Sequence, residues 1–228
     1  MAKLKPKIVI FDVDGVLVDV RDSYHRTMVE TVQRFTNCRV ARSEINRWKN
    51  SPGYNDDWKL TAHWIRLLGS RPRYAEVIRV FQQLYLGRHF NGYISRERWL
   101  FDRVRLRRLA RRVELALFTG RPRRELLHTL NKFRVRGYFR CIVALEDVKR
   151  SKPDPEGLRC ILEGRDPAIA LYLGDSVDDA RAAQRASVAF IGVLPRGSQS
   201  WRFRAPLLRR LGAVTVLGSV NELEKWLQ

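Results

Sequence analysis

The sequence predicts a doubly wound α/β fold: a parallel sheet with helices on both faces, into which a second, helical unit is inserted. Two observations lead to this prediction. Short, nearly continuous apolar stretches alternate with segments of helical spacing, which is typical of a parallel sheet that is buried on both sides. Acidic residues and glycine turns follow several of these stretches, where open α/β sheets bind their ligands.

The strands of the sheet are predicted from apolar, β-branched stretches, each short enough for a buried strand. These stretches cover residues 7–15, 114–120, 141–148, 169–176, 188–195 and 213–219. Helical spacing is found between them, at residues 121–133, 154–164 and 177–186. A strand followed by a helix and another strand is the unit from which parallel sheets are built.

The alternation is interrupted between the first and second predicted strands. Here the sequence changes to Trp-, Tyr- and Arg-rich helical patterns, such as residues 21–35 and 71–87, and residues 49–58 carry a loop signal. We therefore expect residues 20–98 to form an inserted α-helical unit. Residues 1–19 and 99–228 then form the α/β core.

Composition bounds the class of protein. The chain has 228 residues, 45% of them hydrophobic, which is enough for a substantial core. No apolar run reaches the roughly 18 to 20 residues of a membrane span, and no signal-peptide cleavage pattern follows the start, so we expect a cytoplasmic protein, monomeric or homodimeric, without a membrane partner. Cys38, Cys141 and Cys160 lack disulfide or zinc-site spacing and are expected to be buried.

The charge is strongly positive, with 44 Lys and Arg against 24 Asp and Glu, a net charge of +20. The excess gathers in residues 102–112, which hold six arginines, and in residues 180–221, which hold no acid. Such stripes attract polyanions and would suit weak nucleic-acid binding. Solvated helix faces of an arginine-rich chain explain them as well, and we favour this interpretation because no recognisable nucleic-acid motif accompanies the stripes.

Four short motifs stand at or just after predicted strand ends: "DVDG" (12–15), "FTGRP" (118–122), "KPDP" (152–155) and "GDSVDD" (174–179). Each alone is weak, because acids and glycines of this kind also form turns and cap helices. Together and in this order they resemble the four signature motifs of the haloacid dehalogenase-like hydrolase superfamily, whose core is Rossmann-like. The resemblance covers the core from end to end.

The position of the insert, between the first and second motifs, resembles the helical C1 cap of the subfamily I branch that includes phosphoglycolate phosphatase and β-phosphoglucomutase. The resemblance implies a Mg²⁺-dependent phosphatase of small phosphorylated metabolites, whose cap closes over the site about hinges near residues 18–21 and 95–103. A phosphomutase of the same family is the alternative. A binding protein that keeps the fold, or a phosphatase of nucleotides or nucleic-acid ends, would use the basic surface.

The motifs supply what phosphoester hydrolysis needs: a nucleophile, positive charge for the phosphoryl oxygens and a proton for the leaving group. The resemblance makes Asp12 the nucleophile, which forms an aspartyl-phosphate, and Asp14 the general acid and base. A hard cation with oxygen ligands removes the repulsion between carboxylate and phosphate. Its expected ligands are Asp12, the backbone carbonyl of Asp14, Asp175 and Asp179, with Asp178 as the competing candidate, although the last three acids could instead cap a helix.

The remaining motif residues match phosphate-binding positions of the family. Thr119 resembles the hydroxyl that bonds a phosphoryl oxygen, the Gly120 amide lies beside it at a helix start, and Lys152 resembles the cation that neutralises the phosphate and steadies the nucleophile. Arg121 could reach the substrate, or stand there by chance in an arginine-rich chain.

The inserted unit offers candidates for substrate specificity. Asn55, Asp56 and Trp58 lie on an expected loop or helix start, where caps of this type place specificity residues. An N-capped helix with Trp58 packed inside the unit explains the same residues. Arg21, near the hinge, could bind a second anionic group or lie on the surface. The identity of the substrate is not encoded in the motifs.

Overall fold

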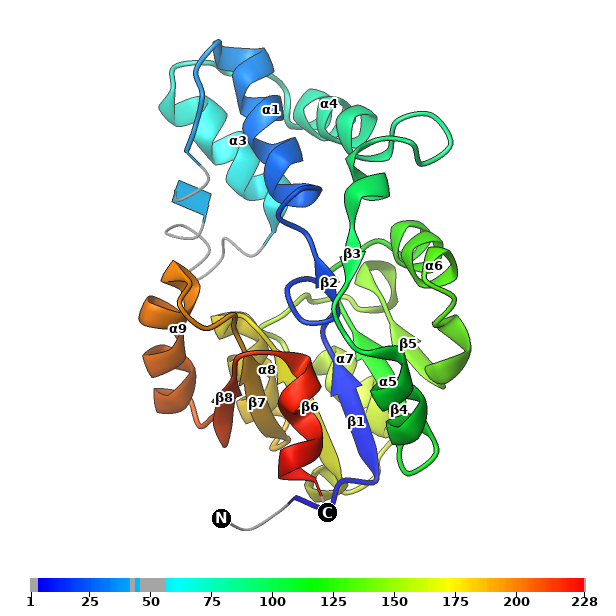
Figure 1. Cartoon of the computed structure of the whole chain (residues 1–228). Helices are drawn as coiled ribbons and strands as arrows, with labels where there is room; N and C mark the ends of the chain where they lie inside the picture. The colour runs from blue at the N-terminus through cyan, green and yellow to red at the C-terminus, as the bar shows by residue number, and fades with distance from the viewer. Residues whose placement is uncertain (1–3, 42–43, 46–55, 228) are drawn as a thin grey trace. The chain divides into compact units, whose positions relative to one another are not determined.

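The computed structural model describes residues 4–41, 44–45 and 56–227 and divides the chain into two compact units (Figure 1). The first unit, Met1–Val18 with Trp99–Gln228, is called the α/β unit below, and the second, Asp19–Arg98, is called the helical unit. The chain passes between them through β2 (Val18–Asp19) and β3 (Arg98–Trp99), which pair with each other.

The α/β unit is built on a parallel sheet of six strands, in the order β5-β4-β1-β6-β7-β8, which confirms the predicted fold class. Each predicted stretch contains one strand: β1 (Ile8–Phe11), β4 (Glu114–Phe118), β5 (Cys141–Val143), β6 (Ala170–Gly174), β7 (Ala189–Val193) and β8 (Thr215–Leu217). The stretch 141–148 is strand only at its start. Its second half forms the 3-10 turn η3 (Leu145–Asp147), because the Asp147 carboxylate accepts a bond from the Ala144 amide at 2.7 Å.

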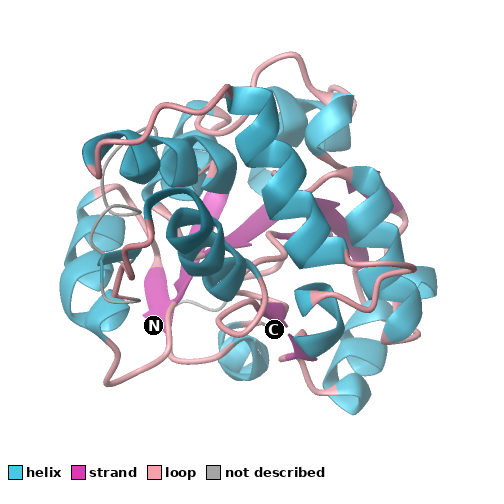
Figure 2. Cartoon of the chain, turned by 90° about the horizontal axis from the view of Figure 1, so that it is seen from above, coloured by secondary structure: helices cyan, strands magenta, loops and turns pink. Residues whose placement is uncertain are grey.

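Helices cover both faces of this sheet (Figure 2). One face packs on α7 (Glu156–Leu162), α8 (Val177–Arg185) and α9 (Gln199–Arg210), whose small and aliphatic residues join the strands in one apolar core. The other face lies against α5 (Arg103–Ala110), α6 (Arg123–Lys132) and the 3-10 helix η5 (Val220–Trp226). Short 3-10 turns, η2 (Arg136–Tyr138) and η4 (Pro167–Ile169), precede β5 and β6. The helix α9 carries Pro206 in its interior and was not indicated by the sequence.

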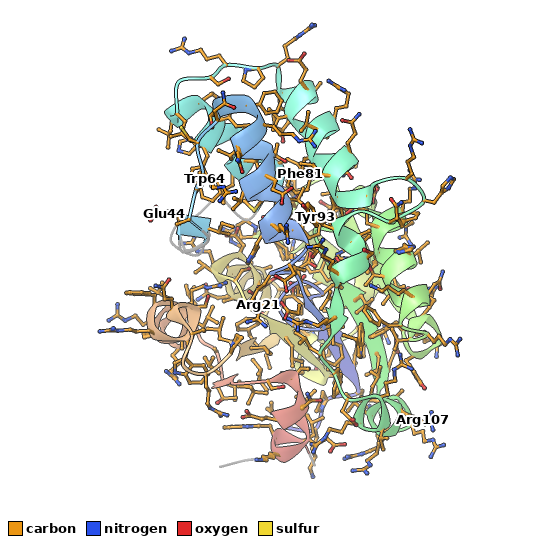
Figure 3. The ribbon with its side chains drawn as sticks, turned by 45° about the horizontal axis from the view of Figure 1, so that its top comes forward. Arg21, Glu44, Trp64, Phe81, Tyr93 and Arg107 are labelled. Carbon is orange, nitrogen blue, oxygen red and sulfur yellow. The ribbon has the colours of Figure 1, made fainter. Side chains whose placement is uncertain are left out.

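Among the described residues, the helical unit contains α1 (Tyr24–Thr36), α3 (Asp57–Leu67), α4 (Tyr74–Leu86) and the 3-10 helix η1 (Tyr93–Arg96). Aromatic rings fill its core: Tyr24 stacks on Tyr85 with ring centroids 4.2 Å apart, and Phe81 lies 5.9 Å from Tyr24. Figure 3 shows Phe81 and Trp64 pointing in among these helices. Tyr85 and Phe81 lie four residues apart on α4, so one face of the helix supplies both rings.

Two further expectations concern exposure. The prediction that the cysteines are buried is wrong for Cys38 and Cys160, which are exposed, and Cys141 is half-buried. Cys160 and its neighbour Arg159 lie on the exposed side of α7. This helix is so short that the spacing of its apolar residues does not distinguish its buried face from its exposed face. Among the residues that the structure describes, none of the helices combines the length and the apolar character needed to cross a membrane.

Candidate active site

The site lies where the order of the strands reverses. β1 is flanked by β4 and β6, with Phe11 opposite Leu117 on one side and Leu173 on the other. Asp12 therefore leaves the sheet beside the ends of both neighbouring strands, and its amide donates to the Leu173 carbonyl at 2.8 Å. Open α/β sheets bind ligands at this kind of switch point, outside the carboxyl ends of the strands.

Lys152 connects the first and fourth motifs. Its ammonium donates to Asp12 Oδ1 at 2.8 Å, to Asp179 Oδ1 at 2.6 Å and to the Tyr172 hydroxyl at 3.2 Å. The side chain is almost fully buried, which acts to lower the pKa of Lys152, but Asp12 and Asp179 outweigh this and raise it. The lysine is therefore held as a cation against the predicted nucleophile.

Asp179 is anchored on both of its oxygens. Oδ1 accepts from the Tyr172 hydroxyl at 2.6 Å as well as from Lys152, and Oδ2 accepts from the Ser176 amide at 3.0 Å and hydroxyl at 2.6 Å. Burial acts to raise the pKa of Asp179, but Lys152 and these hydrogen bonds outweigh it and lower the pKa. Gly174 makes the close approach feasible, because a Cβ there would lie 2.4 Å from the Asp179 Cβ.

Three carboxylates form the group that could hold a cation. Asp12, Asp175 and Asp179 each offer an oxygen within 4.8 Å of the others. Burial raises the pKa of Asp12 against the opposing effect of Lys152, and the neighbouring carboxylates of Asp179, Asp14 and Asp175 add to the rise. Oxygen donors of this type are the ligands that Mg²⁺ takes, so these residues fit the ion. Asp178 does not join the group, and burial raises its pKa.

Asp14 contacts Arg121 rather than the carboxylate group. The Arg121 side chain is buried, its guanidinium donates to Asp14 through Nε at 3.1 Å and through Nη2, and Nη1 donates to the Thr129 hydroxyl at 2.9 Å. The sequence offered Arg121 as a residue that could reach the substrate. In this structure its guanidinium bonds the carboxylate of Asp14, the predicted acid and base, and a contact with substrate stays a prediction.

The second motif follows β4. The Thr119 amide donates to the Val143 carbonyl at 3.0 Å, and its hydroxyl accepts from the Arg121 amide at 3.2 Å. Gly120 is exposed and precedes α6, which begins at Arg123. Thr119 and Asp12 thus end neighbouring parallel strands, as the sequence predicted from their positions.

The predicted specificity residues belong to the helical unit. Asp56 is the N-cap of α3 and accepts from the amides of Trp58 at 3.0 Å and Lys59 at 3.1 Å. Trp58 is half-buried in the first turn of α3, and Asn55 lies outside the described residues. Arg21 donates to Asp19 through Nε at 2.9 Å and Nη2 at 2.6 Å. Helix capping, one of the two interpretations that the sequence left open, is thus seen for Asp56.

Three residues of the site were not singled out from the sequence. Tyr172 lay inside a predicted strand, Ser176 lay unremarked within the fourth motif, and Arg204 was counted with the exposed basic stretch. A signal existed for two of them: a tyrosine in a fully buried strand needs a partner for its hydroxyl, and Ser176 with Asp179 three residues later has the spacing of a capping box. Arg204 donates to Asp175 Oδ2 at 3.1 Å. No local sequence pattern predicts this contact, because the two residues lie on different elements.

Comparison with known proteins identifies the family. The model of the family described as haloacid dehalogenase-like hydrolase matches residues 9–193. The chain belongs to the haloacid dehalogenase-like hydrolases. This confirms the resemblance drawn from the four motifs and the prediction of a hydrolytic enzyme.

Two relatives, one named as a phosphatase and one named as a dehydratase, align with about four fifths of this chain. A protein named imidazoleglycerol-phosphate dehydratase, from Phytophthora nicotianae, is 32% identical over 195 residues, which are 81% of this chain and 42% of that protein. Phosphoglycolate phosphatase 1 from Pseudomonas aeruginosa is 26% identical over 191 residues, 80% of this chain and 67% of that protein. The chain thus spans less than half the length of the first relative and about two thirds of the second.

Solved structures share the fold of this haloacid dehalogenase-like hydrolase. CbbY from Rhodobacter sphaeroides, solved in complex with phosphate, has a TM-score of 0.72 at 22% identity and covers 96% of both chains. A subfamily IA, variant 1 hydrolase from Geobacter sulfurreducens has a TM-score of 0.67 at 23% identity, covering 97% of this chain and 100% of its own. Both comparisons support the α/β architecture described above.

Proposed function

We propose that this protein is a Mg²⁺-dependent phosphatase that hydrolyses small phosphomonoesters through an aspartyl-phosphate on Asp12. The observation that carries the proposal is the buried pair of Lys152 and Asp12, 2.8 Å apart, beside the carboxylates of Asp175 and Asp179. A buried lysine that holds one oxygen of a carboxylate at the switch point of the sheet orients the other oxygen for attack.

In the first step, an Asp12 oxygen attacks phosphorus, the bond from phosphorus to the ester oxygen breaks, and Asp14 gives its proton to the departing alcohol. In the second step, Asp14 takes a proton from water, which attacks the phosphorus and releases inorganic phosphate and the Asp12 carboxylate. Two easier displacements thereby replace one difficult displacement. Arg121 keeps Asp14 in place between the steps, through the Nε contact at 3.1 Å.

Positive charge and hydrogen-bond donors must surround the phosphoryl oxygens. Asp12, Asp175, Asp179 and the backbone carbonyl of Asp14 are the residues that we assign to the cation. When bound, Mg²⁺ supplies the charge that offsets repulsion between a carboxylate nucleophile and a phosphate dianion. We assign the hydroxyl of Thr119 to a phosphoryl oxygen, and the helical unit to the role of a cap that supplies substrate specificity and excludes water.

The test is phosphate release from p-nitrophenyl phosphate and from a panel of phosphoglycolate, sugar phosphates, nucleotides and imidazoleglycerol phosphate, with Mg²⁺ or EDTA. Asp12→Asn is expected to lower turnover by about 10⁴-fold or more, the order of loss when a nucleophile is removed. Asp102→Asn is the matched control, because Asp102 caps α5 on the surface and asparagine caps equally well. Full activity of folded Asp12→Asn would exclude the aspartyl-phosphate route.

A phosphomutase would use the same residues and pass the phosphoryl group to a second hydroxyl of the substrate instead of to water. Phosphorus NMR of a reaction with β-glucose 1-phosphate separates the two activities. Inorganic phosphate as the product supports the phosphatase, and an isomeric sugar phosphate supports the mutase.

A second candidate function rests on the basic surface of α5 and the neighbouring turn η2. Figure 3 shows Arg107 pointing away from the ribbon, and its Nε lies 3.5 Å from the Tyr138 hydroxyl on η2. The exposed arginines of α5, of η2 and of the residues next to them in the chain are called the arginine face: Arg103, Arg105, Arg107, Arg108, Arg111, Arg112, Arg134, Arg136 and Arg140. Glu224 lies 3.6 Å from both Arg105 and Arg108. Residues 102–112 carry six arginines against one acid, Asp102, so the stretch is strongly cationic.

We infer that the arginine face contacts the phosphates of a nucleic acid. Phosphate contacts of this kind make affinity fall steeply with salt, because bound counterions are released. Fluorescence anisotropy of a labelled 20-nucleotide strand, between 50 and 200 mM salt, measures that slope. Arg103, Arg107 and Arg111 changed together to glutamate should abolish binding, whereas the same change at Arg66, Arg71 and Arg79 of the helical unit should weaken it only slightly. Equal losses of affinity in the two variants would show that net charge alone, and not the arginine face, accounts for the binding.

A further inference from the structure

Arg204 is the one arginine of α9 that lies inside the protein. Its neighbours Arg202 and Arg209 are exposed, whereas only 5% of the Arg204 surface reaches solvent. Ala205 and Leu208 share its buried side of the helix and pack into the apolar core. An arginine in such a place is costly unless its charge is paired and its donors are bonded.

The partner of this arginine is the third predicted metal ligand. Arg204 Nη1 donates to the backbone carbonyl of Asp175 at 3.0 Å and to its carboxylate Oδ2 at 3.1 Å. Arg204 Nη2 donates to the hydroxyl of Ser200, one turn earlier on α9, at 2.8 Å. Because one nitrogen bonds both the backbone and the carboxylate of Asp175, it restricts rotation of that side chain.

Gly15 confines the same carboxylate from the other side. Its φ is +79°, and a Cβ at this position would lie 2.7 Å from Asp175 Oδ2. Only glycine adopts this conformation without strain and leaves that space. Oδ2 is thus held between the first motif and α9, which limits the orientations that the Asp175 carboxylate can take.

We infer that Arg204 is a positioning residue that presents Asp175 to the metal ion; the inference rests on the cation site of the proposed function. Groups that hydrogen-bond a metal ligand fix its orientation, and their loss commonly costs 10- to 100-fold in metal affinity. The planar guanidinium holds Asp175 through Nη1 and Ser200 through Nη2, two nitrogens fixed in one plane, whereas a lysine offers one nitrogen on a flexible stem.

Charge and orientation make opposite predictions for this residue, and that makes the inference testable. A guanidinium next to a ligand repels a cation, so its removal tightens Mg²⁺ binding if charge alone matters. If Arg204 acts by orienting Asp175, its removal weakens binding, because the carboxylate then rotates freely.

The experiment is calorimetric titration of Mg²⁺ into the full-length protein without substrate, for wild type, Arg204→Met, Arg204→Lys and the control Arg202→Met. We expect the dissociation constant to rise about tenfold in Arg204→Met and severalfold in Arg204→Lys. Arg202→Met should bind as wild type, because Arg202 is exposed on the same helix. Far-UV circular dichroism in EDTA checks that each variant is folded.

Ser200→Ala removes the bond from Arg204 Nη2 and tests the inference if Arg204→Met does not fold. It should weaken Mg²⁺ binding by up to about tenfold, because Nη1 still holds Asp175. The inference is overturned if folded Arg204→Met binds Mg²⁺ as tightly as wild type or more tightly. If Arg204→Met does not fold, the same result in Ser200→Ala overturns it. Wild-type protein that binds Mg²⁺ but releases no phosphate would refute the proposed phosphatase while leaving the role of Arg204 intact. The converse, full turnover together with unchanged Mg²⁺ binding in Arg204→Met, would refute only the role of Arg204.

Discussion

Replacing Tyr172 with phenylalanine isolates one buried hydroxyl at the centre of the site. The ring packs between Phe118 and Phe190, with centroids 6.0 and 5.9 Å away, and these contacts persist in the variant. The hydroxyl donates to Asp179 Oδ1 at 2.6 Å and accepts from Lys152 at 3.2 Å, and both of these bonds are lost.

The size of the effect follows from these contacts. A buried hydrogen bond to a charged group contributes about 1.5–3 kcal/mol. Asp179 Oδ1 keeps its bond from Lys152 at 2.6 Å, so the loss falls in the lower part of that range, about 2 kcal/mol. For a chain of this size the melting temperature should drop by about 4–8 °C.

Urea denaturation in EDTA, followed by circular dichroism, measures the free energy of unfolding. The m-value should stay constant, since the variant exposes no additional surface on unfolding. Tyr138→Phe is the matched control. Tyr138 is half-buried and its hydroxyl accepts a long bond from Arg107, at 3.5 Å, so the change should alter stability by less than about 0.5 kcal/mol. If Tyr172→Phe were as stable as this control, the hydroxyl would not hold Asp179, and our account of the buried network would be wrong.

The same reasoning gives three further predictions. Gly174→Ala places a Cβ 2.4 Å from the Asp179 Cβ and should destabilise the protein by about 1–3 kcal/mol in urea denaturation. Asp19→Asn removes a carboxylate whose pKa is lowered to about 2, chiefly by the hydrogen bond from Arg21. Since this pKa is lowered on folding, its stabilisation is present above pH 4 and lost between about pH 4 and 2, and we expect about 1 kcal/mol after solvent screening. In Mg²⁺ buffer, EDTA should lower the melting temperature of wild type but not of Asp175→Asn. The ion stabilises the folded state of a variant only if that variant binds it.

Controls for these variants lie in the same chain. Gly137→Ala should be neutral or slightly stabilising, because no atom lies within 4 Å of its added Cβ. Asp22→Asn, which is close to Arg98 at 3.6 Å but half exposed, should alter the pH dependence of stability less than Asp19→Asn does. An Asp19→Asn variant that loses stability below pH 4 as steeply as wild type would show that another group titrates there.

Much of the fold and of the site was predictable because it depends on local pattern. A strand buried on both faces is a run of apolar residues, and all six strands of the sheet lie within such runs. The ends of parallel strands meet at one edge, so the positions of Asp12, Thr119 and Asp175 after their strands already indicated a shared site. Strand limits were less certain, as η3 shows, because a side chain to backbone bond can end a strand early.

The architecture, the family and the motif residues could be inferred from short stretches of neighbouring residues. Which cations act within the site could not, because that depends on how distant elements pack together. Arg202 and Arg204 stand two residues apart in one acid-free stretch, yet only Arg204 reaches Asp175, and Arg121 meets an acid 107 positions away. Such pairs form when separate elements dock on the sheet, and the energy of a buried charge depends on these distant partners rather than on its sequence neighbours.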